Sequence, residues 1–330
     1  MTAGLSADRR RAMLRTAMGP AIAAALAEPA VIEVMVNPDG ALRLDVLGEG
    51  RVDTDVRMEP AQVERIIRLV ASHARAEVHG DAPIVSAELP PHAEGKAGER
   101  FEGILPPVAT APCFAIRKPA ERIYTLADYV GDGFMSPGTA DYLRRAVRDR
   151  RNILVAGGTS SGKTTLANAL LAEMADIDER VILIEDTREL QSPARDTVAL
   201  RTRPGVVGMT ELVRSTLRLR PDRIIVGEVR GREALDMLKA WNTGHPGGIA
   251  TVHANSALSA LYRIEQLVQE AVVTVPRHLI AEAIDLVVFI AGRGLARRVQ
   301  AIARVAGLDP DGNYTVLNLS DSLAPEGEQP

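Results

Sequence analysis

One short segment restricts the possible folds of this chain more than any other: NILVAGGTSSGKTT, residues 152–165. Residues 157–164 match the pattern G-x-x-x-x-G-K-[ST], and the match lies between an apolar run and a helix-forming run. In such a strand–loop–helix unit, glycines let the backbone wrap round phosphate groups, while N–H groups at the helix N-terminus supply positive potential. The segment therefore predicts a loop that binds the phosphates of a nucleotide.

Individual residues of this loop have distinct expected roles. Lys163 should place its charge on the β- and γ-phosphates, and the Thr164 hydroxyl should bind Mg²⁺. A nucleotide and Mg²⁺ are accordingly the predicted ligands. The residues expected to contact the nucleotide are Gly157, Gly158, Thr159, Ser160, Ser161, Gly162, Lys163, Thr164 and Thr165.

Strands and helices alternate in the C-terminal half of the chain. The patterns predict helices over 139–150 and 163–174, and buried strands over 152–158, 180–186 and 224–226. Each of these strands is a short continuous apolar run, which indicates a mainly parallel sheet covered on both faces. We therefore expect residues 138–319 to form an α/β domain.

The N-terminal half follows a different pattern. A hairpin is predicted over 31–46, round an Asn-Pro-Asp-Gly turn, and an amphipathic helix over 60–74. Strands are expected within 83–89, 100–106 and 113–118. Because 330 residues suffice for two separate cores, these elements predict a smaller α+β domain. Its expected range is 1–120, with a Gly- and Pro-containing linker over 121–137 and a disordered tail over 320–330.

Composition excludes several classes of function. A net charge of −4 and 3% aromatic residues provide neither a general basic field nor stacking platforms, so we expect no direct sequence-specific binding of nucleic acid. The single cysteine, Cys113, excludes an internal disulfide and a cysteine-rich zinc site.

No apolar run approaches the roughly 18 to 20 residues of a membrane span. Any membrane contact should therefore be peripheral or through partners. The arginine-containing N-terminus predicts an amphipathic helix rather than a signal sequence.

Carboxylates follow two of the predicted strands. Glu185 and Asp186 end the strand over 180–186, and Glu228 comes shortly after the strand over 224–226. At the C-terminal edge of a parallel sheet these groups should lie beside the phosphate loop, where Glu185 and Glu228 can hold Mg²⁺ directly or through water. Asp186 has the alternative role of capping the next segment. We assign the general base to Glu228, with Glu185 as the rival.

Arginines are frequent between these strands. Most are expected on solvated faces or in surface ion pairs, whereas one or two would reach a γ-phosphate across a subunit boundary. The candidates are Arg201, Arg203, Arg214, Arg218, Arg220 and Arg230.

Two of the six histidines lie close together in TGHPGGIATVHA, residues 243–254. A metal pair is disfavoured because no cysteine is near and the carboxylates are assigned to Mg²⁺. Two interpretations stay open. The histidines are core residues satisfied by hydrogen bonds, or a loop and strand bring His253, and secondarily His245, toward the γ-phosphate or the neighbouring subunit. A neutral imidazole both donates and accepts a hydrogen bond, so His253 could sense that phosphate.

Four segments in order, GGTSSGKTT, IEDTREL, LRLRPDRIIVGEVRG and TGHPGGIATVHANS, span about residues 157–256. They resemble the Walker A, Asp box, Walker B and His box of the secretion ATPase superfamily of type II and type IV secretion systems. The reading GHPGG…TVHANS, together with GPAIAAALAEPAVIEVMVNPDG in the N-terminal half, looks like the conjugal transfer branch, the TrbB-type ATPases.

This resemblance implies a RecA-like P-loop NTPase domain that holds ATP against the smaller N-terminal α+β domain. It implies catalytic roles for Lys163, Glu185, Glu228 and His253, and it implies that Arg117, in CFAIRK, reaches the nucleotide. It also implies a cytoplasmic homohexamer, peripheral at the inner membrane, whose partners are inner-membrane secretion channel proteins.

The expected function is Mg²⁺-dependent ATP hydrolysis that powers conjugative or type IV secretion, through pilus assembly or DNA transfer. One alternative is an ATP-dependent assembly scaffold of the channel. Another is a type II secretion or pilus motor, although a four-cysteine zinc module frequent in that branch has no counterpart in a chain with one cysteine. A DNA-translocating enzyme is disfavoured by the charge and aromatic content.

Overall fold

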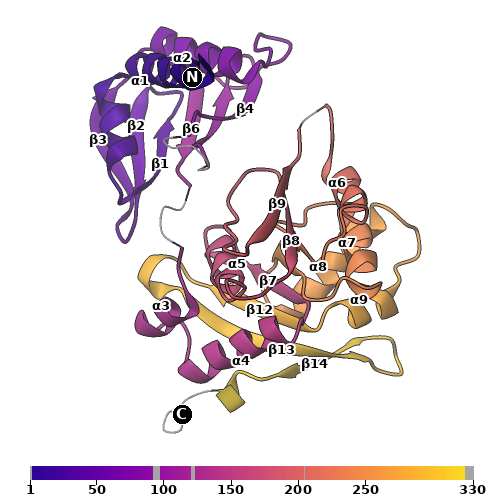
Figure 1. The fold of residues 1–330 in the computed structure, drawn as a ribbon. Helices are drawn as coiled ribbons and strands as arrows, with labels where there is room; N and C mark the ends of the chain where they lie inside the picture. The colour runs from indigo at the N-terminus through magenta and orange to yellow at the C-terminus, as the bar shows by residue number, and fades with distance from the viewer. Residues whose placement is uncertain (1, 92–96, 120–122, 204, 324–330) are drawn as a thin grey trace. The chain divides into compact units, whose positions relative to one another are not determined.

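The computed structural model describes residues 2–91, 97–119, 123–203 and 205–323. They fall into two compact units, Met1–Glu121 and Arg122–Pro330 (Figure 1). Among the described helices, none is long and apolar enough to span a membrane.

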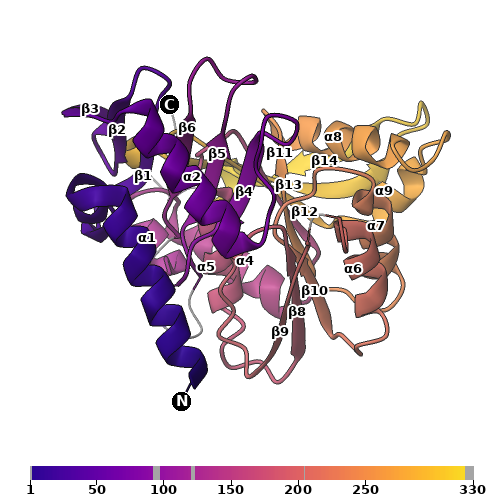
Figure 2. The ribbon, with the colours of Figure 1, turned by 90° about the horizontal axis from the view of Figure 1, so that it is seen from above.

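The first unit is a six-stranded antiparallel sheet in the order β3-β2-β1-β6-β5-β4, packed against two helices (Figure 2). The predicted hairpin and the predicted amphipathic helix are both confirmed, and Ile66 and Ile67 of that helix are fully buried. The strands are β1 (Val31–Val36), β2 (Ala41–Val46), β3 (Gly50–Arg57), β4 (Ile84–Glu88), β5 (Arg100–Ile104) and β6 (Cys113–Arg117), and the helices are α1 (Thr2–Ala27) and α2 (Pro60–Ala74).

The second unit is an eight-stranded sheet in the order β14-β13-β12-β7-β11-β10-β8-β9. Strands β12, β7, β11, β10, β8 and β9 are parallel, and β13 and β14 extend the sheet antiparallel. The strands are β7 (Ile153–Gly157), β8 (Arg180–Glu185), β9 (Asp196–Arg201), β10 (Arg223–Val226), β11 (Ile249–His253), β12 (Leu286–Ala291), β13 (Arg298–Leu308) and β14 (Tyr314–Asn318). This mixed α/β architecture confirms the predicted fold class.

Helices cover both faces of this sheet, with α3, α4 and α5 on one side and α6, α7, α8 and α9 on the other (Figure 1). Their bounds are α3 (Leu126–Gly131), α4 (Pro137–Arg148), α5 (Lys163–Ala172), α6 (Met209–Thr216), α7 (Glu233–Asn242), α8 (Ala257–Gln269) and α9 (Arg277–Ala283), and the 3₁₀ turns are η1 (Gly294–Ala296) and η2 (Asp321–Leu323).

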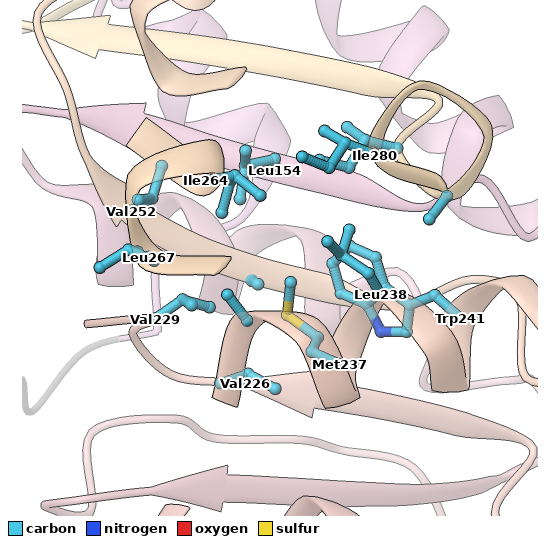
Figure 3. Packing of buried hydrophobic residues seen from close by; sticks show 14 of the residues in the cluster. Leu154, Val226, Val229, Met237, Leu238, Trp241, Val252, Ile264, Leu267 and Ile280 are labelled. Carbon is cyan, nitrogen blue, oxygen red and sulfur yellow. The ribbon is translucent and has the colours of Figure 1, made fainter. Parts of the chain in front are cut away.

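Each central strand contributes to two cores because its side chains alternate between faces. In β7, Ile153 and Val155 pack on the α5 side, whereas Leu154 packs on the α7 side. On that second side, Trp241 and Leu238 of α7 lie over the sheet (Figure 3). Burial on both faces explains why these strands are continuous apolar runs in the sequence.

The segment expected to be a linker, 121–137, contains the helix α3. A capping box between Thr125 and Asp128 starts this helix, and Leu126 and Tyr129 are fully buried in the core of the second unit. The helix is only six residues long, which is too short for its apolar spacing to show in the sequence. Residues 324–330 of the predicted tail lie outside the described residues. Residues 321–323 of it form the turn η2, in which Leu323 O accepts a hydrogen bond from Ser136 Oγ (2.5 Å).

Candidate nucleotide-binding site

The phosphate loop joins the fully buried strand β7 to helix α5. Ser160 and Gly162 adopt left-handed φ angles of 61° and 93°, which turn the chain sharply before the helix. At Gly157 a Cβ atom would lie 2.3 Å from Ile290 O and 2.6 Å from Ser161 Oγ, so only glycine fits. The loop thus has the tight backbone that the motif predicted.

Side chains of the loop lie close to its backbone. Lys163 Nζ donates a hydrogen bond to Gly158 O (2.9 Å), which holds the ammonium group over the loop. Ser161 is buried, and its Oγ finds no hydrogen-bond partner among the described residues. Thr164 and Thr165 are half-buried in the first turn of α5. The ammonium and the first-turn hydroxyl therefore both lie at the helix N-terminus, where an anion binds favourably.

Four of the predicted site residues lie at or just after the carboxyl ends of neighbouring strands. The strands β7, β11, β10 and β8 are adjacent and parallel, so their carboxyl ends line up. His253 is the register partner of Gly157, which places it beside the start of the phosphate loop. Glu185 ends β8, and Glu228 is the second residue after the end of β10. The topology thus brings these carboxylates and this histidine to the phosphate loop.

Glu185 is 3% exposed, and its Oε1 accepts hydrogen bonds from the backbone N–H groups of Glu189 (2.9 Å) and Leu190 (2.7 Å). Burial raises the pKa of this carboxyl to about 7, although the two backbone hydrogen bonds lower it. The Glu185 side chain also packs on Gly227, where a Cβ would lie 3.0 Å from its Cγ. One carboxylate oxygen is therefore committed to holding the 186–190 loop.

Glu228 is more accessible, with its side chain 28% exposed. Arg230 Nη2 donates to Glu228 Oε2 (2.5 Å), and Arg230 Nη1 lies 3.9 Å from Asp186 Oδ2. Partial burial lowers the pKa of Arg230, but the hydrogen bond to Glu228 and the surrounding acids outweigh it, so the pKa is raised. Asp186 in turn accepts a hydrogen bond from Thr202 Oγ1 (2.8 Å). This network links the ends of β10, β8 and β9.

The two histidines of residues 243–254 lie at opposite edges of the sheet. His253 is exposed at the carboxyl end of β11. His245 precedes β11, and its Nδ1 lies 2.9 Å from Pro221 O, just before β10 begins. The expectation that His245 approaches the γ-phosphate is therefore wrong, because β11 separates it from the phosphate loop. For His245, the structure agrees with the alternative of a histidine satisfied by a hydrogen bond.

The Gly-Gly pair between the histidines is explained by packing. The N–H groups of Gly247 and Gly248 donate to Asn152 Oδ1 (2.8 and 2.9 Å). A Cβ at Gly248 would lie 2.0 Å from Trp241 Nε1, which donates to Ile224 O (3.0 Å). Gly248 thus allows the chain to pass under the Trp241 ring, and Gly247 makes a turn at a φ of 85°, both at the end of β11 away from the phosphate loop.

Among the candidate arginines, Arg230 lies in the site and Arg214 does not. Arg214 pairs with Asp236 of α7 (3.0 Å), as expected for a surface ion pair. Arg117 ends β6 in the first unit, beside Arg100 and Glu33 in register. Its contact with a nucleotide in the second unit stays a prediction.

No sequence pattern identified Arg297, which lies against the phosphate loop. A Cβ at Gly162 would lie 2.7 Å from both Nε and Cζ of Arg297, so the guanidinium rests on the loop backbone. Its Cζ lies 5.9 Å from the centre of the Phe134 ring, and within the described chain its buried Nε has no hydrogen-bond partner. Gly292 (φ 83°) makes the turn, since a Cβ there would lie 2.1 Å from Ala296 O.

The donor groups at this edge suit one kind of metal site. In the described ranges, no cluster of three or more His, Cys, Asp or Glu side chains is arranged to hold a metal ion. Mg²⁺ in nucleotide sites is typically held by phosphates, water and one or two protein oxygens rather than by a protein cage. The hydroxyl of Thr164 and the carboxylate of Glu228, whose side chain is partly exposed, fit that mode, whereas Glu185 is buried. Each of the two carboxylates has one oxygen bound within the protein, that of Glu228 by Arg230 and that of Glu185 by the 186–190 loop.

Comparison with known proteins gives consistent results. The family model described as type II/IV secretion system protein matches residues 53–315. The conjugal transfer protein TrbB of Rhizobium radiobacter is 47% identical over 296 residues, covering 89% of this chain and 90% of that protein. The type IV secretion system protein VirB11 of Bartonella henselae is 32% identical over 305 residues, covering 80% and 83% of the two chains.

Two solved structures share the fold. The pilus retraction motor PilT with bound ADP has a TM-score of 0.60 at 18% identity, covering 90% of this chain and 80% of that one. The ATPase DotB of Legionella pneumophila has a TM-score of 0.57 at 17% identity, covering 89% and 77%.

Proposed function

We propose that this chain hydrolyses ATP to power conjugative type IV secretion. The chain belongs to the type II/IV secretion system protein family. The 47% identity to a conjugal transfer protein, over 89% of the chain, supports the conjugative branch over the type II branch. One observation carries the catalytic part of the proposal: the phosphate loop shares one sheet edge with an accessible carboxylate, Glu228.

In the proposed reaction, water attacks the γ-phosphorus of ATP, and the bond between this phosphorus and the β,γ-bridging oxygen breaks to leave ADP. Lys163 and the loop N–H groups bind the β- and γ-phosphates. Glu228 accepts the proton of the attacking water, with its carboxylate oriented by Arg230. Thr164 and Glu228 would hold Mg²⁺, directly or through water, and the ion would neutralise charge on the phosphates.

The remaining residues act round this centre. Glu185 fixes the 186–190 loop next to Gly227 and so supports the site rather than taking the proton. His253 contacts the γ-phosphate from β11, beside Gly157. Arg297 contacts the part of the nucleotide that is not transferred, because it approaches from the β12 side of the loop, away from the carboxylates.

The functional assembly that we propose is a homohexamer in which Arg117 of the N-terminal domain reaches the bound nucleotide. It lies on the cytoplasmic side of the inner membrane as a peripheral protein and acts on channel proteins of the secretion system. The similarity to a conjugal transfer protein and to a type IV secretion system protein supports the part of this proposal that concerns the secretion system.

The test is phosphate release from ATP and Mg²⁺ by purified wild-type protein, Lys163→Ala and Lys239→Ala. Lys239 is an exposed lysine on α7 and serves as a matched control for loss of a lysine. Wild type and Lys239→Ala should hydrolyse ATP, and Lys163→Ala should not. Full hydrolysis by Lys163→Ala, or none by wild type, would refute the proposal. Donor cells that carry the same variants should transfer DNA in the same order.

A further inference from the structure

We propose that Thr251 is a positioning residue that fixes the catalytic segment of Glu228 to the strand that carries His253. The inference rests on the proposed function, since it concerns the base of that reaction. Thr251 lies in β11, two residues before His253, and is 1% exposed, so it contacts neither water nor nucleotide. Its effect must therefore act through the groups that it binds.

Hydrogen bonds on both sides of Glu228 converge on Thr251. Its hydroxyl donates to Gly227 O (2.6 Å), one residue before Glu228. Its carbonyl accepts from Val229 N–H (2.9 Å), one residue after Glu228. The backbone that carries the Glu228 side chain is thus held to β11 at two points.

The hydroxyl acts at the position where regular sheet pairing ends. The parallel pairing of β10 with β11 runs through Ile225↔Ile249 and Val226↔Ala250 and does not extend to Thr251. At the first residue after β10, Gly227 still donates its N–H to Ile184 O on the β8 side (2.9 Å). On the β11 side, the carbonyl of Gly227 is bound by a side chain instead. The identity of residue 251, and not only its backbone, therefore determines how the Glu228 segment leaves the sheet.

The two hydrogen bonds of Thr251 also link the Glu228 segment to β11, which pairs with β7 beside the phosphate loop. Thr251 is the register partner of Val155 in β7, and His253 is the partner of Gly157 at the start of the phosphate loop. A displacement of β11 caused by a ligand at His253 reaches Glu228 through the two bonds at Thr251. Without the hydroxyl, Arg230 still pairs with the carboxylate, but the backbone beneath it is anchored less firmly.

Valine is the nearest shape to threonine that lacks the hydroxyl, so Thr251→Val is the test variant. Because small misplacement of a catalytic group costs up to about 100-fold in rate, we expect kcat for ATP to fall by about 10- to 100-fold. The KM and the affinity for ATP should change by less than about 3-fold, since Thr251 does not touch the phosphates. Thr251→Ser keeps the hydroxyl and should restore kcat to within about 3-fold of wild type.

Thr216→Val provides a matched control. Thr216 is fully buried in the same unit, and its hydroxyl also donates to a backbone carbonyl at 2.6 Å, that of Val213. This substitution should lower stability while leaving kcat unchanged. Thr251→Ala, which also lacks the hydroxyl, gives the same comparison if the valine variant does not fold.

Two failures are distinguishable. Wild-type protein that binds but does not hydrolyse ATP would refute the proposed function and the role of Thr251 with it. Hydrolysing wild type with an equal kcat for Thr251→Val, or an equal loss for Thr251→Val and Thr251→Ser, would refute the positioning role alone.

Discussion

Replacing Glu185 by glutamine is expected to stabilise the nucleotide-free protein at pH 8 and to have little such effect at pH 4.5. The carboxyl is 3% exposed, and burial raises its pKa to about 7 from an ordinary value of 4.5. Glutamine keeps an oxygen that can accept the hydrogen bonds from Glu189 and Leu190 N–H. It differs from the carboxylate mainly in carrying no charge at any pH.

The sign follows from proton binding. Between pH 4.5 and 7 the folded protein holds the proton more tightly than the unfolded chain, so wild-type stability falls as pH rises through this range. Above pH 7 the penalty is constant, and below pH 4.5 it vanishes. One pKa unit corresponds to about 1.4 kcal/mol, so a pKa difference of about 2.5 gives roughly 3 kcal/mol as an upper value.

The assay is denaturant unfolding of wild type and Glu185→Gln at intervals from pH 4.5 to 8.5, without nucleotide or Mg²⁺. The difference in the free energy of unfolding should grow in favour of the variant by up to about 3 kcal/mol over this range. Glu282→Gln, which removes an exposed carboxylate of α9, should show no such growth. A Glu185→Gln difference that is independent of pH, or one that grows toward low pH, would refute the reasoning.

His253→Ala should lower kcat by about 10-fold while changing ATP affinity less, because the imidazole is assigned to the γ-phosphate; equal losses in both would contradict a sensor role. Arg297→Ala should weaken ATP and ADP binding alike by about 10-fold, since an arginine contact with a phosphate is lost. Arg293→Ala, at an exposed position of the same turn, should leave both affinities unchanged, and unaltered nucleotide affinity of Arg297→Ala in equilibrium titration would exclude the proposed contact.

Local sequence signals were sufficient for the parts of the fold that depend on near neighbours. The buried runs of β7, β8 and β10 and the strand–loop–helix order of the phosphate loop follow from apolar continuity and glycine placement. The approach of Glu185 and Glu228 to that loop follows from the rule that carboxyl ends of parallel strands share an edge. Each of these inferences needs only a short window of sequence.

Features that depend on strand order were not accessible in this way. Arg297 meets Gly162 because β12 pairs with β7, and no local pattern identifies that pairing. The predicted position of His245 was wrong because His245 and His253 are close in sequence but lie at opposite ends of the strand β11. The Gly-Gly pair suggested a functional turn, whereas contact with Trp241 from another helix is what requires glycine at 248.

In the proposed reaction, Glu228 takes the proton from water while other groups bind the nucleotide. Measuring the ATP affinity and the turnover of Glu228→Gln in the same preparation, beside wild type, separates these two roles. We expect an affinity within about 3-fold of wild type and a kcat lowered by about 100-fold or more, because glutamine cannot accept the proton. Turnover at the wild-type rate, or loss of ATP binding, would contradict it.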